Sequence, residues 1–237
     1  MIRIWSQTLL PPIVTTSLYF VVFGSFIGRQ LADIHCFSYT QFIVPGLIMM
    51  SVITSAYMNT VSTFYFAKWQ KTLDEILVSP TPNWVVIAGF ITGGMMRGLL
   101  VGFLVFLVSL FFTHLVVYNL VVLLAAVVLT SMALSLAGLI NGIFAKGFDG
   151  ISIVPTFVLT PLTYLGGVFY SVNQFSPFWR TVSLFNPILY IVNAFRYGFL
   201  GVSDVSLTVS FALLIGLVVV LSVLALVLFK RGTGFKN

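Results

Sequence analysis

The sequence has few charged residues: 7% of its 237 residues are Asp, Glu, Lys or Arg, whereas a soluble globular domain carries about 25%. Hydrophobic residues make up 59% of the chain, and the mean hydropathy is +1.13. Apolar segments recur up to the C-terminus, which excludes a single cleavable signal sequence followed by a soluble mature chain. The composition therefore predicts an integral membrane protein from which no segment is removed.

The chain also lacks several motifs that would give it a chemistry of its own. Cys36 is the only cysteine, which excludes an intrachain disulfide and a cysteine metal cluster. The net charge of +6 comes from scattered Lys and Arg without a basic run, so nucleic acid is not an expected partner. No phosphate-binding loop of the form G-x-x-x-x-G-K-[ST] occurs, because GIFAKGFDG at 142–150 arranges its glycines and lysine differently. We expect no cofactor or metal on this chain, and ATP hydrolysis on another polypeptide.

Six segments are apolar enough to cross a bilayer as helices, which takes about 20 residues each. They cover residues 9–28, 42–66, 84–113, 116–145, 151–170 and 207–229. Backbone groups in lipid must be paired internally, which favours helices over an open sheet. The predicted fold class is therefore an all-α integral membrane protein, with six transmembrane helices in one domain over residues 1–237. No fixed repeat and no inverted pair of halves occurs, which favours a pathway between two chains over one within a single chain.

An even number of spans places both termini on the same side of the membrane. If that side is the cytoplasm, most Lys and Arg outside the spans lie inside, which agrees with the positive-inside rule. The inner residues are Arg3, Lys68, Lys71, Lys146, Lys230, Arg231 and Lys236, and the outer ones are Arg29, Arg180 and Arg196. We therefore expect a multi-pass protein of a bacterial inner membrane with both termini in the cytoplasm.

The segment 68–79, between the second and third spans, is predicted to form a short amphipathic helix that Pro80 ends. Its apolar face follows the i, i+4, i+7, i+8 pattern and consists of Trp69, Leu73, Ile76 and Leu77. Periodicity alone leaves two interpretations open: a helix lying on the inner leaflet, or a helix that docks on a partner. Glu75 is the residue expected to contact a partner, because anionic lipid would repel its carboxylate.

Arg97 lies near the middle of the third span, where a charged side chain is costly and faces protein or water. Gly94, Gly98 and Gly102 have the spacing that lets a neighbouring helix approach closely. Either backbone carbonyls hold Arg97 at a helix junction, or Arg97 lines a wet cavity and attracts an anionic substrate. Asp and Glu are missing from the interiors of all six spans, which disfavours a proton-driven carrier.

Two of the predicted spans have a polar stripe. The stripe of the fifth span consists of Ser152, Thr156, Thr160, Thr163 and Tyr164, and that of the second span of Ser51, Thr54, Ser55, Asn59 and Ser62. The hydroxyls of the fifth span either compensate for carbonyls freed by Pro155 and Pro161 or line a substrate route. Two stripes without carboxylates suit a large amphipathic cargo better than a small cation.

Two helices too short to cross the bilayer are predicted between residues 173 and 204. They cover 177–185 and 187–200, each begins with proline, and Asn186 caps the second. The longer one extends about 20 Å, less than the roughly 30 Å of a hydrocarbon core. Their aromatic side chains are typical of a membrane interface, where Arg180 and Arg196 would snorkel.

Three stretches of the chain resemble the permeases of the ABC-2 type transporter family, in its group of drug-type and nodulation-factor-type exporters. They are TPLTYLGGVFYSVNQFSPFWRTVSLFNPILYIVNAFRYGFLG at 160–201, FSYTQFIVPGLIMMSVITSAY at 37–57 and LDEILVSPTP at 73–82. FRYGFLG is fairly specific to that group. The resemblance implies that the helix at 68–79 is a coupling helix, whose contacts with an ATPase are Leu73, Asp74, Glu75 and Leu77.

The same resemblance implies a substrate route along the second and fifth spans. The residues expected to line it, with Arg97 added from its position in the third span, are Arg97, Ser51, Thr54, Ser55, Thr156, Thr160, Thr163 and Tyr164. Residues 173–204 would then be a re-entrant hairpin that forms the outer gate. The expected gate residues are Gly166, Gly167, Asn186, Pro187, Arg196 and Tyr197.

The function that the resemblance implies is export of a drug-like or lipid-like substrate by a homodimer in membrane lipid. Two copies of a separate ATP-binding cassette subunit would hold ATP and Mg²⁺, and this chain would catalyse no covalent chemistry. A polysaccharide or glycolipid exporter, a carrier driven by an ion gradient, and a channel or scaffold stay open as alternatives. Related permeases have a further interface helix before the residues that match 3–10, so we expect a truncated start or an internal initiator.

Overall fold

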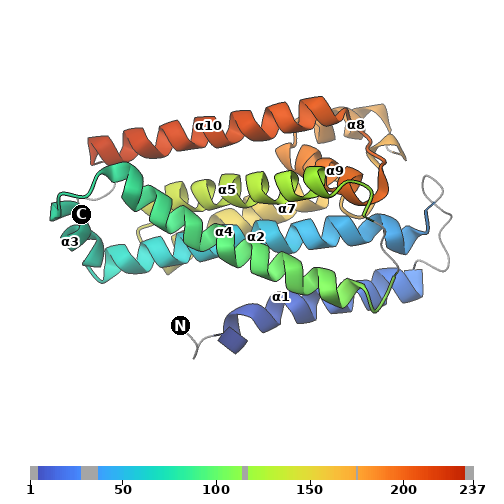
Figure 1. Cartoon of the computed structure of the whole chain (residues 1–237), viewed down its shortest axis with the longest axis horizontal. Helices are drawn as coiled ribbons and strands as arrows, with labels where there is room; N and C mark the ends of the chain where they lie inside the picture. Colours follow the sequence, from blue (N-terminus) through green and yellow to red (C-terminus); the bar gives the residue numbers. More distant parts are fainter. Residues whose placement is uncertain (1–4, 28–36, 114–116, 175, 233–237) are drawn as a thin grey trace.

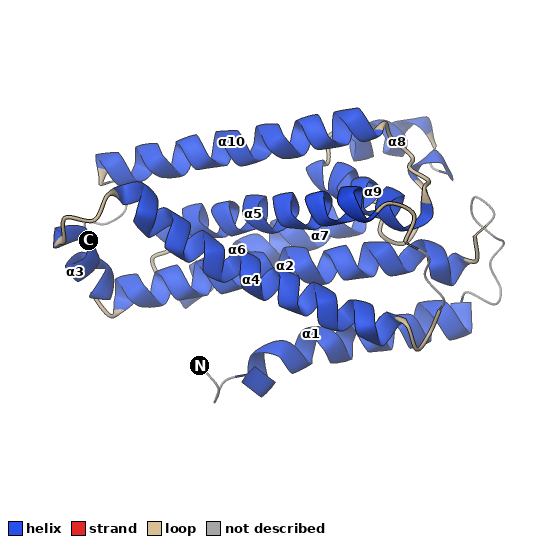
Figure 2. Ribbon diagram, viewed as in Figure 1, coloured by secondary structure: helices blue, strands red, loops and turns tan. Residues whose placement is uncertain are grey.

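The computed structural model describes residues 5–27, 37–113, 117–174 and 176–232. Within these ranges the regular elements are helices and no β-strand is present (Figure 2), which confirms the predicted all-α class. Four of the residues on which the sequence expectations drew lie outside the described ranges: Arg3, Arg29, Cys36 and Lys236.

Four long helices run roughly along the long axis of the molecule (Figure 1). They are α2 (Tyr39–Trp69), α4 (Asn83–Ser109), α5 (Leu120–Phe144) and α10 (Leu207–Arg231). The shortest has 25 residues, which at the α-helical rise gives about 38 Å and exceeds the thickness of a hydrocarbon core. These four are the described helices that are long and apolar enough to cross a membrane.

The segments expected to form the first and fifth spans are interrupted helices. Helix α1 (Trp5–Tyr19) continues into the π-helical segment η2 (Phe20–Ile27). The fifth segment consists of α6 (Phe148–Val154), the π-helical η3 (Pro155–Leu159) and α7 (Thr160–Tyr164). Its last helix, α7, ends at Tyr164, before the expected end at residue 170. In the loop that follows, Gly167 has a φ of 72°, which favours glycine. The number of six spans therefore stays a prediction.

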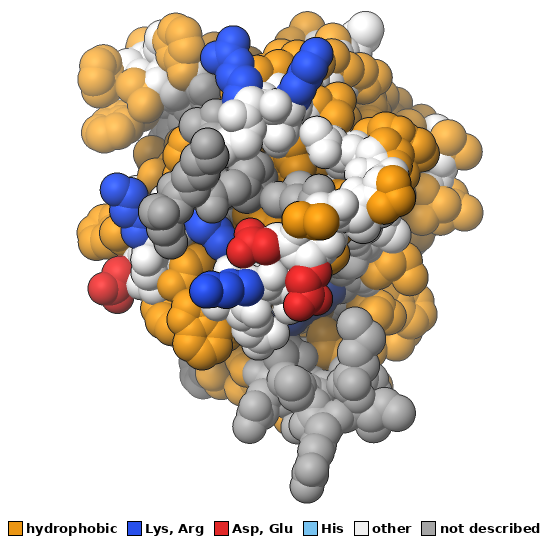
Figure 3. Space-filling view, turned by 90° about the vertical axis from the view of Figure 1, so that its left-hand side faces the viewer, with side chains coloured by type: hydrophobic (Ala, Val, Ile, Leu, Met, Phe, Trp, Pro, Cys, Tyr) orange, Lys and Arg blue, Asp and Glu red, His pale blue; other side chains and the backbone are white. Residues whose placement is uncertain are grey.

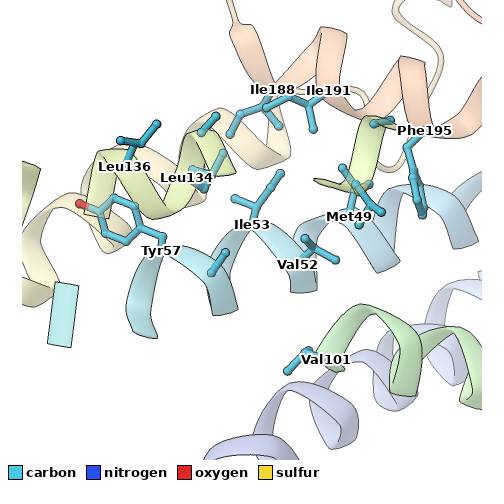
Figure 4. Packing of buried hydrophobic residues seen from close by; sticks show 14 of the residues in the cluster. Met49, Val52, Ile53, Tyr57, Val101, Leu134, Leu136, Ile188, Ile191 and Phe195 are labelled. Carbon is cyan, nitrogen blue, oxygen red and sulfur yellow. The ribbon is translucent and has the colours of Figure 1, made fainter. Parts of the chain in front are cut away.

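Helix α2 is the centre of the bundle. Its apolar stretch is 78% buried, compared with 22% for α10. Figure 4 shows Ile53 of α2 pointing toward Leu134 of α5 and Ile188 of α9, and Tyr57 of α2 beside Leu136 of α5. Because lipid is as apolar as these side chains, close packing rather than the hydrophobic effect holds such helices together.

Helix α3 (Thr72–Val78) is shorter than the helix expected over residues 68–79. Helix α2 continues as far as Trp69, and Lys71 has a left-handed φ of 61° that separates α2 from α3. Trp69 is 62% exposed, whereas Leu73 is 1% exposed. The expected apolar face is therefore wrong for Trp69, because this residue belongs to α2 and lies beyond the turn.

The hairpin consists of the 3-10 turn η4 (Val172–Gln174), α8 (Pro177–Leu184) and α9 (Pro187–Leu200). Asn186 caps α9 by accepting a hydrogen bond from the Ile188 backbone N–H at 3.0 Å. In Figure 1 the hairpin lies at the opposite end of the molecule from α3 and the last turn of α10. We call these two ends the hairpin end and the α3 end.

Candidate functional site

The α3 end of the molecule carries most of the charged side chains of the described residues. Figure 3 shows Lys, Arg, Asp and Glu side chains gathered on this face. The residues in or next to the elements of this end are Lys68, Lys71, Asp74, Glu75, Lys146, Asp149, Lys230 and Arg231. Five of these residues are Lys or Arg, compared with Arg180 and Arg196 in the hairpin, so the positive-inside rule predicts that the α3 end faces the cytoplasm.

Helix α3 presents two carboxylates outward from this charged face. Asp74 and Glu75 are exposed and lie in the first turn, where the helix dipole stabilises negative charge. Leu73 points inward and is almost fully buried. The structure thus places two expected contact residues on the surface and one in the packing beneath them, while the side chain of Leu77 lies outside the described part.

Part of the polar stripe of α2, formed by Ser51, Thr54 and Ser55, lies beside α1. The hydroxyls of Ser51 and Thr16 are 2.8 Å apart, and Ser51 also donates to the Leu47 carbonyl at 3.1 Å. A cavity of about 260 Å³ lies beside this contact, and its lining is Pro11, Pro12, Thr15, Thr16, Tyr19, Leu47, Met50, Ser51, Thr54 and Ser55. We expected the stripe of the second span to line a substrate route together with the fifth span. In the structure, three of its residues instead line a cavity together with α1 of the same chain.

The hydroxyl stripe of the fifth segment is mostly on the surface. Ser152, Thr156, Thr160 and Tyr164 are all exposed and recur every fourth residue. Thr163 differs, since it is 2% exposed and donates to the Leu159 carbonyl at 2.6 Å. This residue belongs to the internal packing, so the exposed surface consists of the other four.

Arg97 makes a polar contact between α4 and α2. Its Nη1 donates to Oδ1 of Asn59 at 2.9 Å. A Cβ at Gly98 would lie 2.9 Å from Ala56 Cβ, so these two helices are too close for a larger side chain. An amide side chain of α2 thus accepts from Arg97, which neither sequence-based interpretation named.

Arg196 is enclosed within the hairpin end and is 1% exposed. Its Nη2 donates to the Gly167 carbonyl at 2.6 Å, and its guanidinium carbon lies 3.8 Å from the centre of the Phe42 ring. The prediction that Arg196 snorkels to the interface is therefore wrong, because α2, α9 and the loop after α7 surround it. Arg180 on α8 is exposed.

Asp204 is a buried carboxylate that sequence reasoning missed. It accepts hydrogen bonds from Ser171 Oγ at 2.6 Å, the Val172 N–H at 3.1 Å and Asn173 Nδ2 at 3.1 Å. Its own N–H donates to Asn193 Oδ1 at 2.8 Å, and its Oδ2 lies 3.9 Å from Arg196 Nη1. Asp204 is the only acidic residue between 173 and 204, which was the available clue.

A second cavity, of about 470 Å³, lies between α4, α5 and α9. Its lining is apolar and includes Phe103, Phe106, Leu124 and Phe199. No described group of three or more His, Cys, Asp or Glu residues is placed to hold a metal ion. The described residues thus form exposed polar surfaces and an apolar cavity.

Comparison with known proteins identifies the class. Residues 1–200 match the ABC-2 type transporter family, and the chain belongs to this family. It is 54% identical over 235 residues to the inner membrane transport permease YadH of Escherichia coli K12, covering 99% of this chain and 92% of YadH. It is 24% identical over 187 residues to nodulation protein J of Rhizobium leguminosarum bv. viciae, covering 78% of this chain and 71% of that protein.

Proposed function

We propose that this chain is the membrane subunit of an ATP-driven exporter of the bacterial inner membrane. Membership of the ABC-2 type transporter family carries the proposal. The α3 end faces the cytoplasm in this arrangement, with both termini on that side, because it bears most of the described positive charge. The chain moves cargo, and a separate ATP-binding cassette subunit hydrolyses ATP with Mg²⁺.

The docking surface for the ATPase is α3. Its two outward carboxylates meet the partner, while Leu73 anchors the helix to the bundle. The Lys68 Nζ donates to the Ile143 carbonyl at 3.1 Å, which ties the end of α2 next to α3 to the last turn of α5. A push on α3 therefore reaches two spanning helices directly.

The cargo route runs along the two polar surfaces. The fifth segment exposes hydroxyls, and the cavity between α1 and α2 is mostly apolar with several hydroxyls and no carboxylate in its lining. Such surfaces suit an amphipathic or hydrophobic cargo that is drug-like or lipid-like. In a homodimer with two ATPase subunits, surfaces of both copies enclose the route.

Affinity purification from the native membrane in mild detergent tests the proposal. We expect an ATP-binding cassette protein to copurify, recognised by its own G-x-x-x-x-G-K-[ST] sequence, and the reconstituted complex to export cargo only with ATP. Glu75→Lys should lower its recovery about tenfold, because the reversed charge opposes a docking contact.

Asp149→Lys is the matched control for this charge reversal. Asp149 is an exposed carboxylate at the same end but on α6, so we expect the ATPase to copurify normally. Recovery of the complex unchanged by Glu75→Lys would contradict docking on α3. Cargo movement by the purified chain alone would contradict the ATP-driven function.

A further inference from the structure

Four aromatic side chains form a contact that we call the aromatic seam. Two of them come from α1 and η2, and two come from α7 and the loop after it. The aromatic seam consists of Tyr19, Phe23, Tyr164 and Phe169. The hydroxyls of Tyr19 and Tyr164 are 3.1 Å apart. The ring of Phe169 stacks on Tyr164 with centroids 5.6 Å apart and lies 4.8 Å from the centroid of Phe23.

The aromatic seam lies where the two polar surfaces meet. Tyr19 lines the cavity that Ser51 and Thr54 share with α1. Tyr164 is the last of the exposed hydroxyl residues of the fifth segment, on the side of the hairpin end. A cargo moving along either surface toward the hairpin end therefore reaches these rings last.

The hairpin helix α9, in contrast, is fixed to its neighbours by backbone contacts. The N–H groups of Asn119 and Tyr118 donate to the Gly198 and Phe199 carbonyls at 2.9 and 3.2 Å. At the other end of α9, Asn186 Nδ2 donates to the Leu162 carbonyl at 2.6 Å.

Moving α9 would also remove the buried contacts of Arg196 and Asp204, and unpaired buried charges are costly. The seam is joined through hydroxyl ends and ring faces. Opening the seam exposes groups that can turn toward water or cargo, so it costs less than moving α9.

We propose that the aromatic seam closes the cargo route at the hairpin end, and that α1 and α7 separate there while α9 stays in place. This inference rests on the proposed export function and specifies its outer closure. The hairpin residues then act as a brace that holds the loop after α7. The rings that part for the cargo belong to α1, η2, α7 and that loop.

Labelling of a single cysteine tests the closure without knowledge of the cargo. In a Cys36→Ser background, Thr156→Cys places a thiol on the stripe about two helical turns from Tyr164, away from the hairpin end. The full chain in proteoliposomes is treated with a membrane-impermeant maleimide from the hairpin side. In the proposed homodimer the second copy covers the exposed face of Thr156, so the reagent reaches it past the aromatic seam. We expect slow labelling when the aromatic seam is intact, and about tenfold faster labelling when Tyr19→Ala and Tyr164→Ala are added.

Tyr190→Ala is the matched control, because it removes an aromatic residue from α9 whose hydroxyl donates to the Leu184 carbonyl at 2.9 Å. We expect it to leave the labelling rate unchanged. Phe178 on α8 is 68% exposed. Labelling of Phe178→Cys therefore shows that the reagent reaches the hairpin end. If the alanine pair does not fold, Tyr19→Phe with Tyr164→Phe keeps the rings, removes the hydroxyl contact and should speed labelling about fivefold.

Two results overturn the inference. In the first, Thr156→Cys is labelled no faster in the folded seam variants than in the chain with an intact seam. In the second, Tyr190→Ala raises the labelling rate as much as the seam variants do. A failure of the export function gives a different pattern, because the seam variants then still change labelling but no ATPase copurifies. If ATP-driven export continues and the seam variants leave the labelling rate unchanged, the closure by the aromatic seam is contradicted and the export function is not.

Discussion

At the scale of the residue, Arg97 and Arg196 show how the same side chain acquires different environments in one chain. Arg97 is partly exposed and donates a hydrogen bond to the amide oxygen of Asn59. Arg196 is enclosed by a carbonyl, an aromatic ring and Asp204. The first links α4 to α2, whereas the second holds parts of the hairpin end together.

We predict that Arg97→Gln lowers export about tenfold, because glutamine can still contact Asn59 but has no charge to attract an anionic group. Uptake of the cargo into inside-out vesicles with ATP measures the effect, and the amount of inserted protein should stay normal. Arg180→Gln, on the exposed surface of α8, should leave export unchanged. Normal export by Arg97→Gln would show that its charge has no part in transport.

The sequence singled out Arg97 and Arg196 but not the partner of either. Asn59 stood in the expected polar stripe without an assigned contact, and Asp204 lies eight residues after Arg196 with no helical periodicity between them. Their proximity depends on how loops close, which spacing does not describe. Composition could identify the costly charges, since few exist, but not what neutralises them.

At the scale of the element, the glycines of α4 determine how closely it approaches α2 and α5. A Cβ at Gly94 would overlap Thr60 Oγ1 and would lie 2.5 Å from Ser135 Oγ and 3.0 Å from the Ala56 carbonyl. A Cβ at Gly93 would have no neighbour within 4 Å. The small-residue spacing in the sequence predicted close approaches at Gly94, Gly98 and Gly102 and at the pair Gly89 and Gly93. The prediction is confirmed for the first three and wrong for the pair, where an added Cβ would have no neighbour within 4 Å.

We predict that Gly94→Ala destabilises the protein by about 1–3 kcal/mol, because the added methyl group forces α4 away from α2 and α5. Unfolding in mixed micelles, followed by helical circular dichroism, measures the change. Gly93→Ala serves as the control, since it adds the same methyl group on a face without contacts. Equal stability of the two variants would mean that the helices separate there without cost.

The boundaries of α3 show what periodicity misses at this scale. The apolar pattern over residues 68–79 is continuous, so it does not reveal the turn at Lys71. A non-glycine residue with positive φ is uncommon, and no local signal announces it here. By contrast, Pro177 and Pro187 begin α8 and α9, because proline suits the first turn of a helix.

At the scale of the whole molecule, one chain leaves its polar surfaces open. The exposed hydroxyls lie on the fifth segment, and α10 is apolar and mostly exposed, as expected of a helix that faces lipid. The Thr160 hydroxyl donates to the Pro155 carbonyl at 2.9 Å, and in the proposed homodimer a second copy would cover this stripe. A dimer also accounts for the absence of a repeat within the chain.

We predict that the protein is a homodimer in lipid nanodiscs, with the fifth segments of the two copies facing each other. In a Cys36→Ser background, Thr160→Cys should crosslink to a dimer with a short bismaleimide. Val223→Cys, on the face of α10 where Val223 is 55% exposed, should give no crosslink. Native mass spectrometry that finds only single chains, with no crosslink at Thr160→Cys, would contradict the dimer.

The sequence by itself determined that this is a helical membrane protein, because hydropathy and the pairing of backbone groups in lipid leave few alternatives. It also located the polar stripes and the proline-led helices of the hairpin. Only the tertiary structure decided that Ser51 meets Thr16, that Arg196 is enclosed with Asp204, and that Tyr19 meets Tyr164. Periodicity defines the face of a helix, but the helix that covers this face depends on packing between segments far apart in the chain.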